Sequence, residues 1–179
     1  TEEEIEKAKP YLVKKINSTK IISLILGGPN KYYSFDDKQL IEIFNKIKSN
    51  IDSDGYKVIV IPSMRTPKSS IELAKKEMDS CGYVVSSVDK QAYLSAYALA
   101  NYVIVTCDST SMISEAATSG KPIFVAHMSA KKNNYRFKRF FELFKQMGIT
   151  RDLGEKVESW TYNKHNEAQR IAIEIKSKI

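Results

Sequence analysis

The chain has 179 residues, of which 42% are apolar and 27% charged, as is typical of one soluble globular domain with its own core. Its apolar runs are too short to span a bilayer. Two cysteines and two histidines, without metal-binding or redox spacing, argue against a disulfide framework and a histidine-rich metal site. The net charge of +7 favours anionic partners, although lysines used for solubility explain it equally well.

The start of the chain and its thiols lead to two further expectations. The sequence begins at Thr1, without a methionine or a signal peptide, so we expect a piece of a longer protein. Cys81 and Cys107 lie in or beside apolar segments. We expect both thiols to be reduced, which fits a cytoplasmic location, with attachment to a membrane surface as an alternative.

Apolar runs that do not alternate with polar residues predict buried strands. Such runs occupy 20–26, 56–62, 82–87, 101–107 and 121–127. Apolar residues at helical spacing predict helices between these strands and after the last one. The predicted helices occupy 35–51, 63–78, 91–100, 110–120, 134–148 and 166–179. The alternation predicts an α/β domain with a parallel sheet of about five to six strands and helices on both faces.

Several helix boundaries carry their own signals. Asp36 or Asp37 suits the N-cap of the first predicted helix. Pro67 suits the first turn of the second helix, and Gly120 suits the C′ position after the fourth.

The helix at 134–148 is amphipathic. A stripe of phenylalanines at helical spacing predicts a face that packs on the sheet, and it consists of Phe137, Phe140, Phe141 and Phe144. A basic cluster at the start of this helix is of the kind that attracts anionic lipid, and it consists of Lys131, Lys132, Arg136, Lys138 and Arg139.

Four loops follow predicted strands, at 27–34, 62–67, 107–111 and 126–134. The carboxyl ends of parallel strands meet at one edge of a sheet, and ligands bind there. We therefore expect the four loops to share one rim.

The first loop reads "GGPNK". Gly27 and Gly28 have no Cβ, so a phosphate could approach the backbone closely, with Asn30 and Lys31 beside it. A purely structural turn explains the glycines equally well. The loop matches neither the Walker pattern nor GxGxxG.

The second loop reads "PSMRTP". Arg65 precedes a helix that starts near a proline, and a guanidinium beside a helix N-terminus is a good anion site. Ser63 and Thr66 add hydroxyls on either side of it. A solvated arginine without a ligand is the alternative.

The stretch "TCDSTSMISEAATSGKP" is the richest in polar residues. We expect a helix to begin within 108–111, so that its free N–H groups and dipole suit a diphosphate. Glu115 either grips ribose hydroxyls or complements the helix dipole. Asp108 caps the helix or faces a partner domain. His127, on the same rim, is either scaffold or a functional group.

Together these segments resemble the C-terminal, donor-binding half of GT-B glycosyltransferases, among them the bacterial enzymes that make lipid II. The segments "LANYVIV", "CDSTS" and "SEAATSGKP" match that half in order. A closer resemblance, from about Ile21 to Ile179, is to the mitochondrial fission ELM-type family of bacteria and plants. "GGPNKYYSFD", "SMRTP", "TCDSTSMISEAATSGKP", "GITRDL" and "ESWTY" resemble its blocks. Met64 departs from the family's second arginine.

This resemblance implies a Rossmann-like three-layer domain of the GT-B C-terminal type, with an N-terminal partner domain outside residues 1–179. Its ligand would be a nucleotide-sugar or nucleoside diphosphate. Glu115 matches the acid that binds the donor ribose. Gly27 and Gly28 match glycines on the diphosphate side. The loop under the nucleotide and diphosphate is matched by Ser109, Thr110 and Ser111, with Met112 beside them.

The catalytic base of such glycosyltransferases usually comes from the N-terminal half, so this domain alone is expected to bind a donor without turning it over. None of the four rim loops contains an Asp-x-Asp motif, and we expect a metal-independent reaction without a resident cofactor.

Two other functions stay open. A non-catalytic adaptor could have kept the fold for contact with a protein or a membrane. A phosphosugar-isomerase-type domain also holds a phosphate with a Ser/Thr-rich loop. We expect no nucleic-acid partner, because no known module for one is present.

Overall fold

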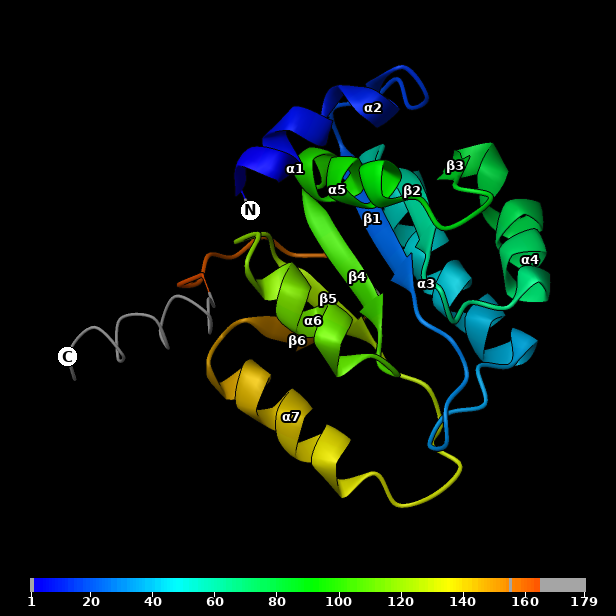
Figure 1. The fold of residues 1–179 in the computed structure, drawn as a ribbon, viewed down its shortest axis with the longest axis vertical. Coiled ribbons are helices and arrows are strands. Elements are labelled where there is room, and N and C mark those ends of the chain that lie inside the picture. Colours follow the sequence, from blue (N-terminus) through cyan, green and yellow to red (C-terminus); the bar gives the residue numbers. More distant parts are fainter. Residues whose placement is uncertain (1, 155, 165–179) are drawn as a thin grey trace.

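The computed structural model describes residues 2–154 and 156–164. Within them, six parallel strands form one sheet in the order β3-β2-β1-β4-β5-β6 (Figure 1). The strands are β1 Ile21–Leu26, β2 Lys57–Pro62, β3 Gly82–Val84, β4 Tyr102–Thr106, β5 Ile123–Ala126 and β6 Thr150–Asp152. The prediction of an α/β domain with about five to six parallel strands is confirmed.

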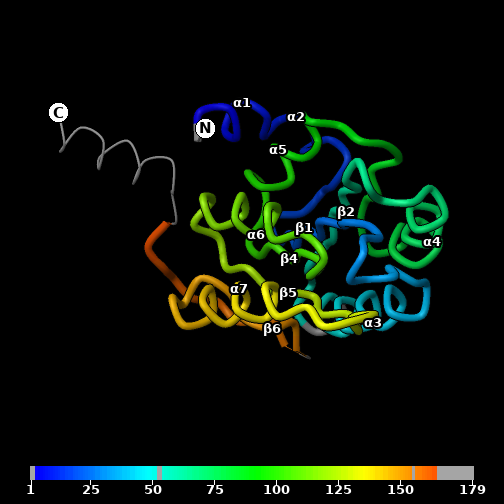
Figure 2. Tube along the Cα trace, turned by 60° about the horizontal axis from the view of Figure 1, so that its bottom comes forward, coloured from blue at the N-terminus to red at the C-terminus, as the bar shows by residue number. Residues whose placement is uncertain are grey.

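Helices lie on both sides of this sheet (Figures 1 and 2). They are α1 Glu2–Ala8, α2 Pro10–Val13, α3 Asp37–Asp54, α4 Lys68–Met78, the 3-10 helix η1 Asp79–Cys81, α5 Lys90–Leu99, α6 Thr110–Ala117 and α7 Tyr135–Gln146. None of the helices in this part of the chain is long and apolar enough to cross a membrane.

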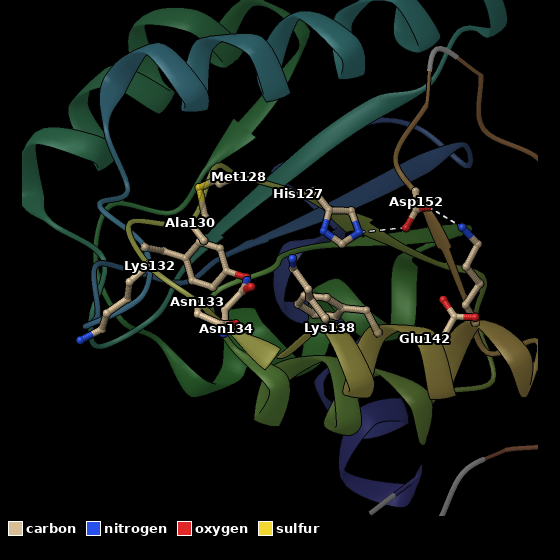
Figure 3. Close-up of a pocket in the computed structure, with 12 residues that line it drawn as sticks. His127, Met128, Ala130, Lys132, Asn133, Asn134, Lys138, Glu142 and Asp152 are labelled. Atoms are coloured by element: carbon tan, nitrogen blue, oxygen red, sulfur yellow. Dashed lines mark hydrogen bonds and ion pairs between the residues drawn. The ribbon is translucent and has the colours of Figure 1, made fainter. Parts of the chain in front are cut away.

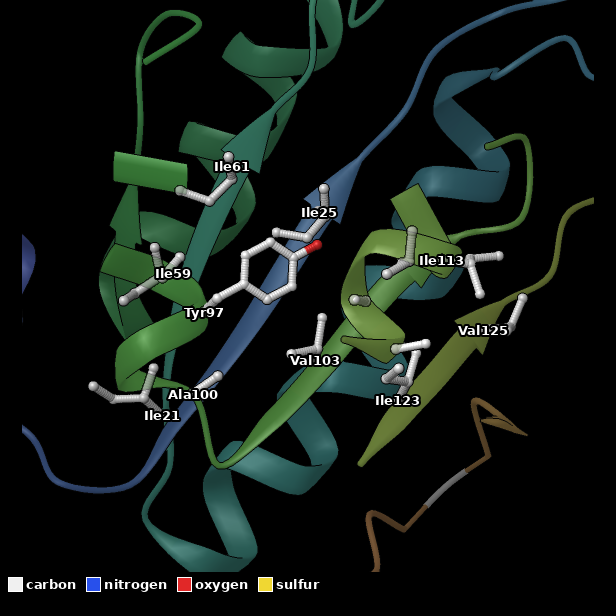
Figure 4. Packing of buried hydrophobic residues seen from close by; sticks show 14 of the residues in the cluster. Ile21, Ile25, Ile59, Ile61, Tyr97, Ala100, Val103, Ile113, Ile123 and Val125 are labelled. Atoms are coloured by element: carbon white, nitrogen blue, oxygen red, sulfur yellow. The ribbon is translucent and has the colours of Figure 1, made fainter. Parts of the chain in front are cut away.

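The core has two halves because neighbouring residues of a strand point to opposite faces of the sheet. On β1, Ile21 and Ile25 belong to one half and Ile22 and Leu24 to the other. The first half packs under α2, α5, α6 and α7, and Figure 4 shows part of it. The second half packs under α3 and α4. Both faces of the central strands are buried, which explains their continuous apolar runs.

The phenylalanine stripe of α7 packs as predicted. Phe144 is buried, and Phe137, Phe140 and Phe141 pack against the first half of the core. The Phe140 and Phe144 rings are 4.2 Å apart. The basic residues at the start of the helix therefore remain on its outer sides.

Two of the helix boundaries differ from the sequence expectation. Asp36 caps α3 as predicted, because its carboxylate accepts the Gln39 N–H. Pro67, however, is the N-cap of α4 and not part of its first turn, and the segment 63–67 is a loop. Gly120 has a φ of 72°, but α6 ends at Ala117 with Thr118 as C-cap, so the glycine follows one position later than predicted.

The sequence analysis did not assign α1 and α2. These helices pack on α5, where the buried hydroxyl of Ser95 accepts the Leu12 N–H at 3.1 Å and donates to the Lys9 carbonyl at 3.0 Å. The predicted helix at 166–179 lies outside the described residues. Neither Cys81 nor Cys107 is in a disulfide.

Candidate functional site

The carboxyl ends of the parallel strands define one rim of the sheet, and the four polar loops follow β1, β2, β4 and β5 at this rim. The chain order reverses between β1 and β4. Accordingly, β1 leads into α3 on one face, whereas β4 leads into α6 on the other. Ligands of open α/β sheets bind where such a reversal separates the loops.

The first turn of α6 leaves hydrogen-bond donors free at this reversal. Ser109 is the N-cap, and its Oγ accepts the Met112 N–H at 3.4 Å and lies 3.2 Å from Ser111 Oγ. The N–H groups of Thr110 and Ser111 have no acceptor within the helix. With the helix dipole, they suit an anion. The predicted helix start within 108–111 is confirmed.

Glu115 lies one turn further along α6 and is held from one side. Its Oε2 accepts a 2.7 Å hydrogen bond from the Tyr93 hydroxyl, which lies 3.1 Å from the Tyr97 hydroxyl. Burial raises the pKa of Tyr93, and Tyr97 and Glu115 raise it further. Tyr93 therefore stays a protonated donor, and the other Glu115 oxygen, Oε1, has no hydrogen-bond partner among the described residues.

A cavity of about 460 Å³ connects these groups, between α5 and the start of α6. This volume is within the range of small-molecule sites. Val88, on the loop after β3, adds an apolar wall that is 55% exposed. Six residues that the sequence singled out line the cavity, namely Ser63, Arg65, Ser109, Ser111, Met112 and Glu115.

Behind this cavity, Asp108 joins three loops of the rim. Its side chain is fully buried, and Oδ2 accepts the Gly28 N–H at 2.9 Å and an Arg65 N–H at 2.8 Å. Arg65 also donates to the Gly28 carbonyl at 3.0 Å. Burial raises the pKa of Asp108, and the Gly28 N–H and Arg65 only partly oppose this. Asp108 therefore does not cap α6, and its side chain contacts the loops of Gly28 and Arg65. Arg65, although partly exposed, is paired with Asp108.

The two glycines after β1 are explained by contacts within the protein. The Gly27 N–H donates to Thr106 Oγ1 at 2.8 Å, and the Gly28 N–H is used by Asp108. A Cβ on Gly27 would lie 2.0 Å from Asp108 Oδ2, and one on Gly28 would lie 2.1 Å from the Arg65 carbonyl oxygen. The space that the glycines leave open is therefore filled by Asp108 and Arg65.

The remaining predicted residues of these two loops organise the backbone or lie outside the cavity. Asn30 accepts the N–H groups of Tyr32 and Tyr33 and donates to the Asp108 carbonyl. The buried Thr66 hydroxyl lies 2.9 Å from the Leu26 carbonyl oxygen and 2.6 Å from that of Gly27, so it donates at the end of β1. Lys31 lies over the Tyr32 ring.

His127 is on the rim, directly after β5, as predicted, but it does not line the cavity that holds Glu115. It lies in a second cavity beside α7 (Figure 3). Within the part of the chain that is described, no three His, Cys, Asp or Glu side chains gather into a metal-binding group.

The sequence analysis missed four residues that line the cavity, namely Val88, Asp89, Lys90 and Tyr93. Tyr93 and Tyr97 are four residues apart, which places both hydroxyls on one face of α5. That spacing was the available signal. Their partner is 22 residues away from Tyr93 in the chain, and no local pattern connects them.

Residues 1–179 match the model of the family described as Mitochondrial fission ELM1. The chain belongs to this family. It is 31% identical over 183 residues to the Rickettsia prowazekii protein RP120, across 97% of this chain and 49% of that protein. It is 26% identical over 122 residues to the mitochondrial fission protein ELM1 of Arabidopsis thaliana, across 65% of this chain and 28% of that protein. The chain thus spans at most about half the length of these relatives.

Two solved structures share the fold. The UDP-GlcNAc 2-epimerase of Methanocaldococcus jannaschii has a TM-score of 0.63 at 17% identity, over 96% of this chain and 50% of that chain. The C-terminal CMP-Kdo-binding domain of WaaA from Acinetobacter baumannii has a TM-score of 0.54 at 14% identity, over 99% of this chain and 89% of that chain. The fold is therefore Rossmann-like and of the GT-B type.

Proposed function

We propose that this chain is a nucleotide-sugar-binding domain that holds the donor of a glycosyl transfer. One arrangement supports this above all: Tyr93 fixes Glu115 in a cavity that begins at the N-terminus of α6. Glu115 Oε1 would accept hydrogen bonds from ribose hydroxyls. The diphosphate would lie against the N–H groups of Thr110 and Ser111, and the base against Val88.

The same groups suit the chemistry of transfer. When a sugar–diphosphate bond breaks, negative charge grows on the leaving diphosphate. The dipole of α6 and the N–H groups of Arg65 that Gly28 and Asp108 do not use would stabilise that charge, so our proposal involves no metal. The proton acceptor for the attacking hydroxyl would come from another part of a longer protein, as in the two-domain enzymes that this fold resembles.

Calorimetry with UDP-, GDP-, ADP- and CMP-sugars tests the proposal. We expect one nucleotide class to bind, and Glu115→Gln to weaken it about tenfold or more, because a charge-assisted hydrogen bond is lost. Glu42→Gln, at an exposed acid of α3, is the matched control. No binding by any nucleotide-sugar, or equal binding by the Glu115 variant, would contradict us. Preference for hexose 6-phosphates would favour the phosphosugar alternative.

A second candidate is an adaptor that contacts anionic membranes. It is supported by one side of α7, where Arg136 and Arg139 lie near the exposed Leu143 and Tyr135. Added salt should screen the attraction between this basic surface and anionic lipid. Liposomes with about 30% anionic lipid should pellet the chain at low salt. The double variant Arg136→Gln, Arg139→Gln should stay in the supernatant. Equal sedimentation of both proteins would rule out this candidate.

A further inference from the structure

The second cavity lies at the carboxyl ends of β5 and β6, against one side of α7, and has a volume of about 800 Å³. His127 projects into it from the end of β5, Asp152 from β6 and Lys138 from α7 (Figure 3). None of these three side chains takes part in the site proposed for the nucleotide.

His127, Asp152 and Lys145 form a connected group on one wall. His127 Nε2 lies 2.8 Å from Asp152 Oδ1, and Lys145 Nζ lies 2.6 Å from Asp152 Oδ2. Partial burial raises the pKa of Asp152, but the hydrogen bonds from Lys145 and His127 outweigh it and the net shift is downward. Both carboxylate oxygens therefore have a cationic or donor partner, and the acid presents little free charge to the cavity.

The His127 ring is held in place. The ring packs edge-on against Phe141, with ring centroids 5.0 Å apart. Its Nε2 is hydrogen-bonded to Asp152. The second nitrogen, Nδ1, has no hydrogen-bond partner among the described residues. A protonated imidazole would offer this Nδ1–H to a ligand.

The cavity also has cations without matching acids. Lys138 forms no ion pair with any described residue, and Figure 3 shows it and Asp152 on opposite sides of the His127 ring. Lys132 lies over the Tyr32 ring, 5.7 Å from its centroid. One further acid, Glu142, lines the cavity, and it accepts a hydrogen bond from Gln146. The wall is thus net positive.

The helices place this cavity relative to the first one. On their common face, α5 packs on β1 and β2, α6 on β4 and β5, and α7 on β6. The N-terminus of α6 therefore lies between the cavity of Glu115 and the cavity of His127. A ligand anchored by a phosphate at α6 could extend into both.

The geometry points to the second cavity as a subsite for an acidic sugar, whose carboxylate or phosphate group binds between His127 and Lys138. The link to a sugar rests on the proposed function, whereas the anion site itself does not. If the proposed function and this subsite are both correct, either the donor carries an acidic sugar that is transferred, or the acceptor is itself acidic.

Three sugars with the same ring test this in the absence of nucleotide: glucuronate, glucose 6-phosphate and glucose. The imidazole signals of the chain are followed by NMR during each titration, and the spectrum of His127→Gln identifies the His127 signals, because the chain has only two histidines. We expect at least one acidic sugar to shift these signals saturably and glucose to leave them unchanged. Binding of glucuronate would indicate a carboxylate subsite, and binding of glucose 6-phosphate would indicate a phosphate subsite.

Lys138→Met should weaken this binding about tenfold, since it removes a charge-assisted contact, whereas Lys46→Met, on the exposed side of α3, should not. No shift with either acid, an equal shift with glucose, or unchanged affinity in Lys138→Met would overturn the inference. If only the nucleotide-sugar proposal is wrong, calorimetry will show no binding of nucleotide-sugars, while an acidic sugar will still shift the His127 signals.

Discussion

The loop after β1 and the start of α6 are neighbours on the rim, and both have the small and polar residues typical of phosphate-binding loops. Their hydrogen bonds differ. In the β1 loop, the N–H groups of Gly27 and Gly28 already have acceptors within the protein. At the start of α6, the N–H groups of Thr110 and Ser111 have none within the helix. The first segment is therefore a closed part of the scaffold, and the second is open to a ligand.

This difference shows that glycines after a strand do not by themselves indicate a ligand. The absence of a Cβ at Gly27 and Gly28 makes room for Asp108 and for the backbone of Arg65. The substitutions below separate the closed loop from the open helix start.

The largest effect is expected for Gly28→Ala. Its Cβ would lie 2.1 Å from a backbone oxygen of Arg65, which cannot move aside as a flexible side chain could. We expect the free energy of unfolding to fall by about 3 kcal/mol or more, measured by urea denaturation. Gly154→Ala is the control, because its Cβ would meet no atom within 4 Å. Equal stability of the two variants would show that the loop is not closed.

Asp108→Ala should come next. It removes the acceptor of the Gly28 N–H and leaves Arg65 without its acid. Because Arg65 is 41% exposed, water takes over part of its solvation, so we expect a loss of about 2 kcal/mol in urea denaturation. A loss below about 0.5 kcal/mol, the range of ordinary surface changes, would mean that Asp108 does not join the loops.

The N-caps give a smaller contrast. Asp89 accepts the N–H groups of Gln91 and Ala92 at the start of α5, at 2.8 and 3.0 Å, whereas Ser109 makes one 3.4 Å bond. Asp89→Ala should cost about 1 kcal/mol and Ser109→Ala about 0.5 kcal/mol. Thermal unfolding of both variants measures this. A larger cost for Ser109→Ala would indicate that α6 starts as firmly as α5 and is less open.

The smallest effect is a difference in pH dependence. Since burial raises the pKa of Asp108, its contribution to stability is fully present at low pH and is lost as the pH rises through the raised pKa. Asn cannot ionise, so the stability of the wild type relative to Asp108→Asn should fall as the pH rises above the ordinary carboxyl pKa of about 4. Denaturant titrations at several pH values measure this stability difference. A difference that stays constant or rises with pH would contradict the claim that the ionised form of Asp108 is unfavourable in the folded protein.

Much of the fold could be predicted because the central strands are apolar on both faces. Strand β6 could not, since only Thr150 of its three residues is buried. The short helices α1 and α2, separated by Lys9, offered too few turns for a clear period. These elements depend on packing that a local pattern does not contain.

The candidate site was predicted only in part. The start of α6 and the position of Glu115 follow from local signals, which is why they were found. The pairing of Arg65 with Asp108 spans 43 residues, and that of Tyr93 with Glu115 spans 22. Such contacts exist only after the strands have assembled, so the sequence could indicate the residues but not which of them are already occupied.

A crystal structure with the nucleoside diphosphate that binds best in calorimetry tests the central claim most directly. We predict that the diphosphate contacts the N–H groups of Thr110 and Ser111, with the ribose hydroxyls on Glu115 and the Asp108–Arg65 pair intact. A diphosphate bound to the Gly27–Gly28 backbone instead, with that pair broken, would contradict the account.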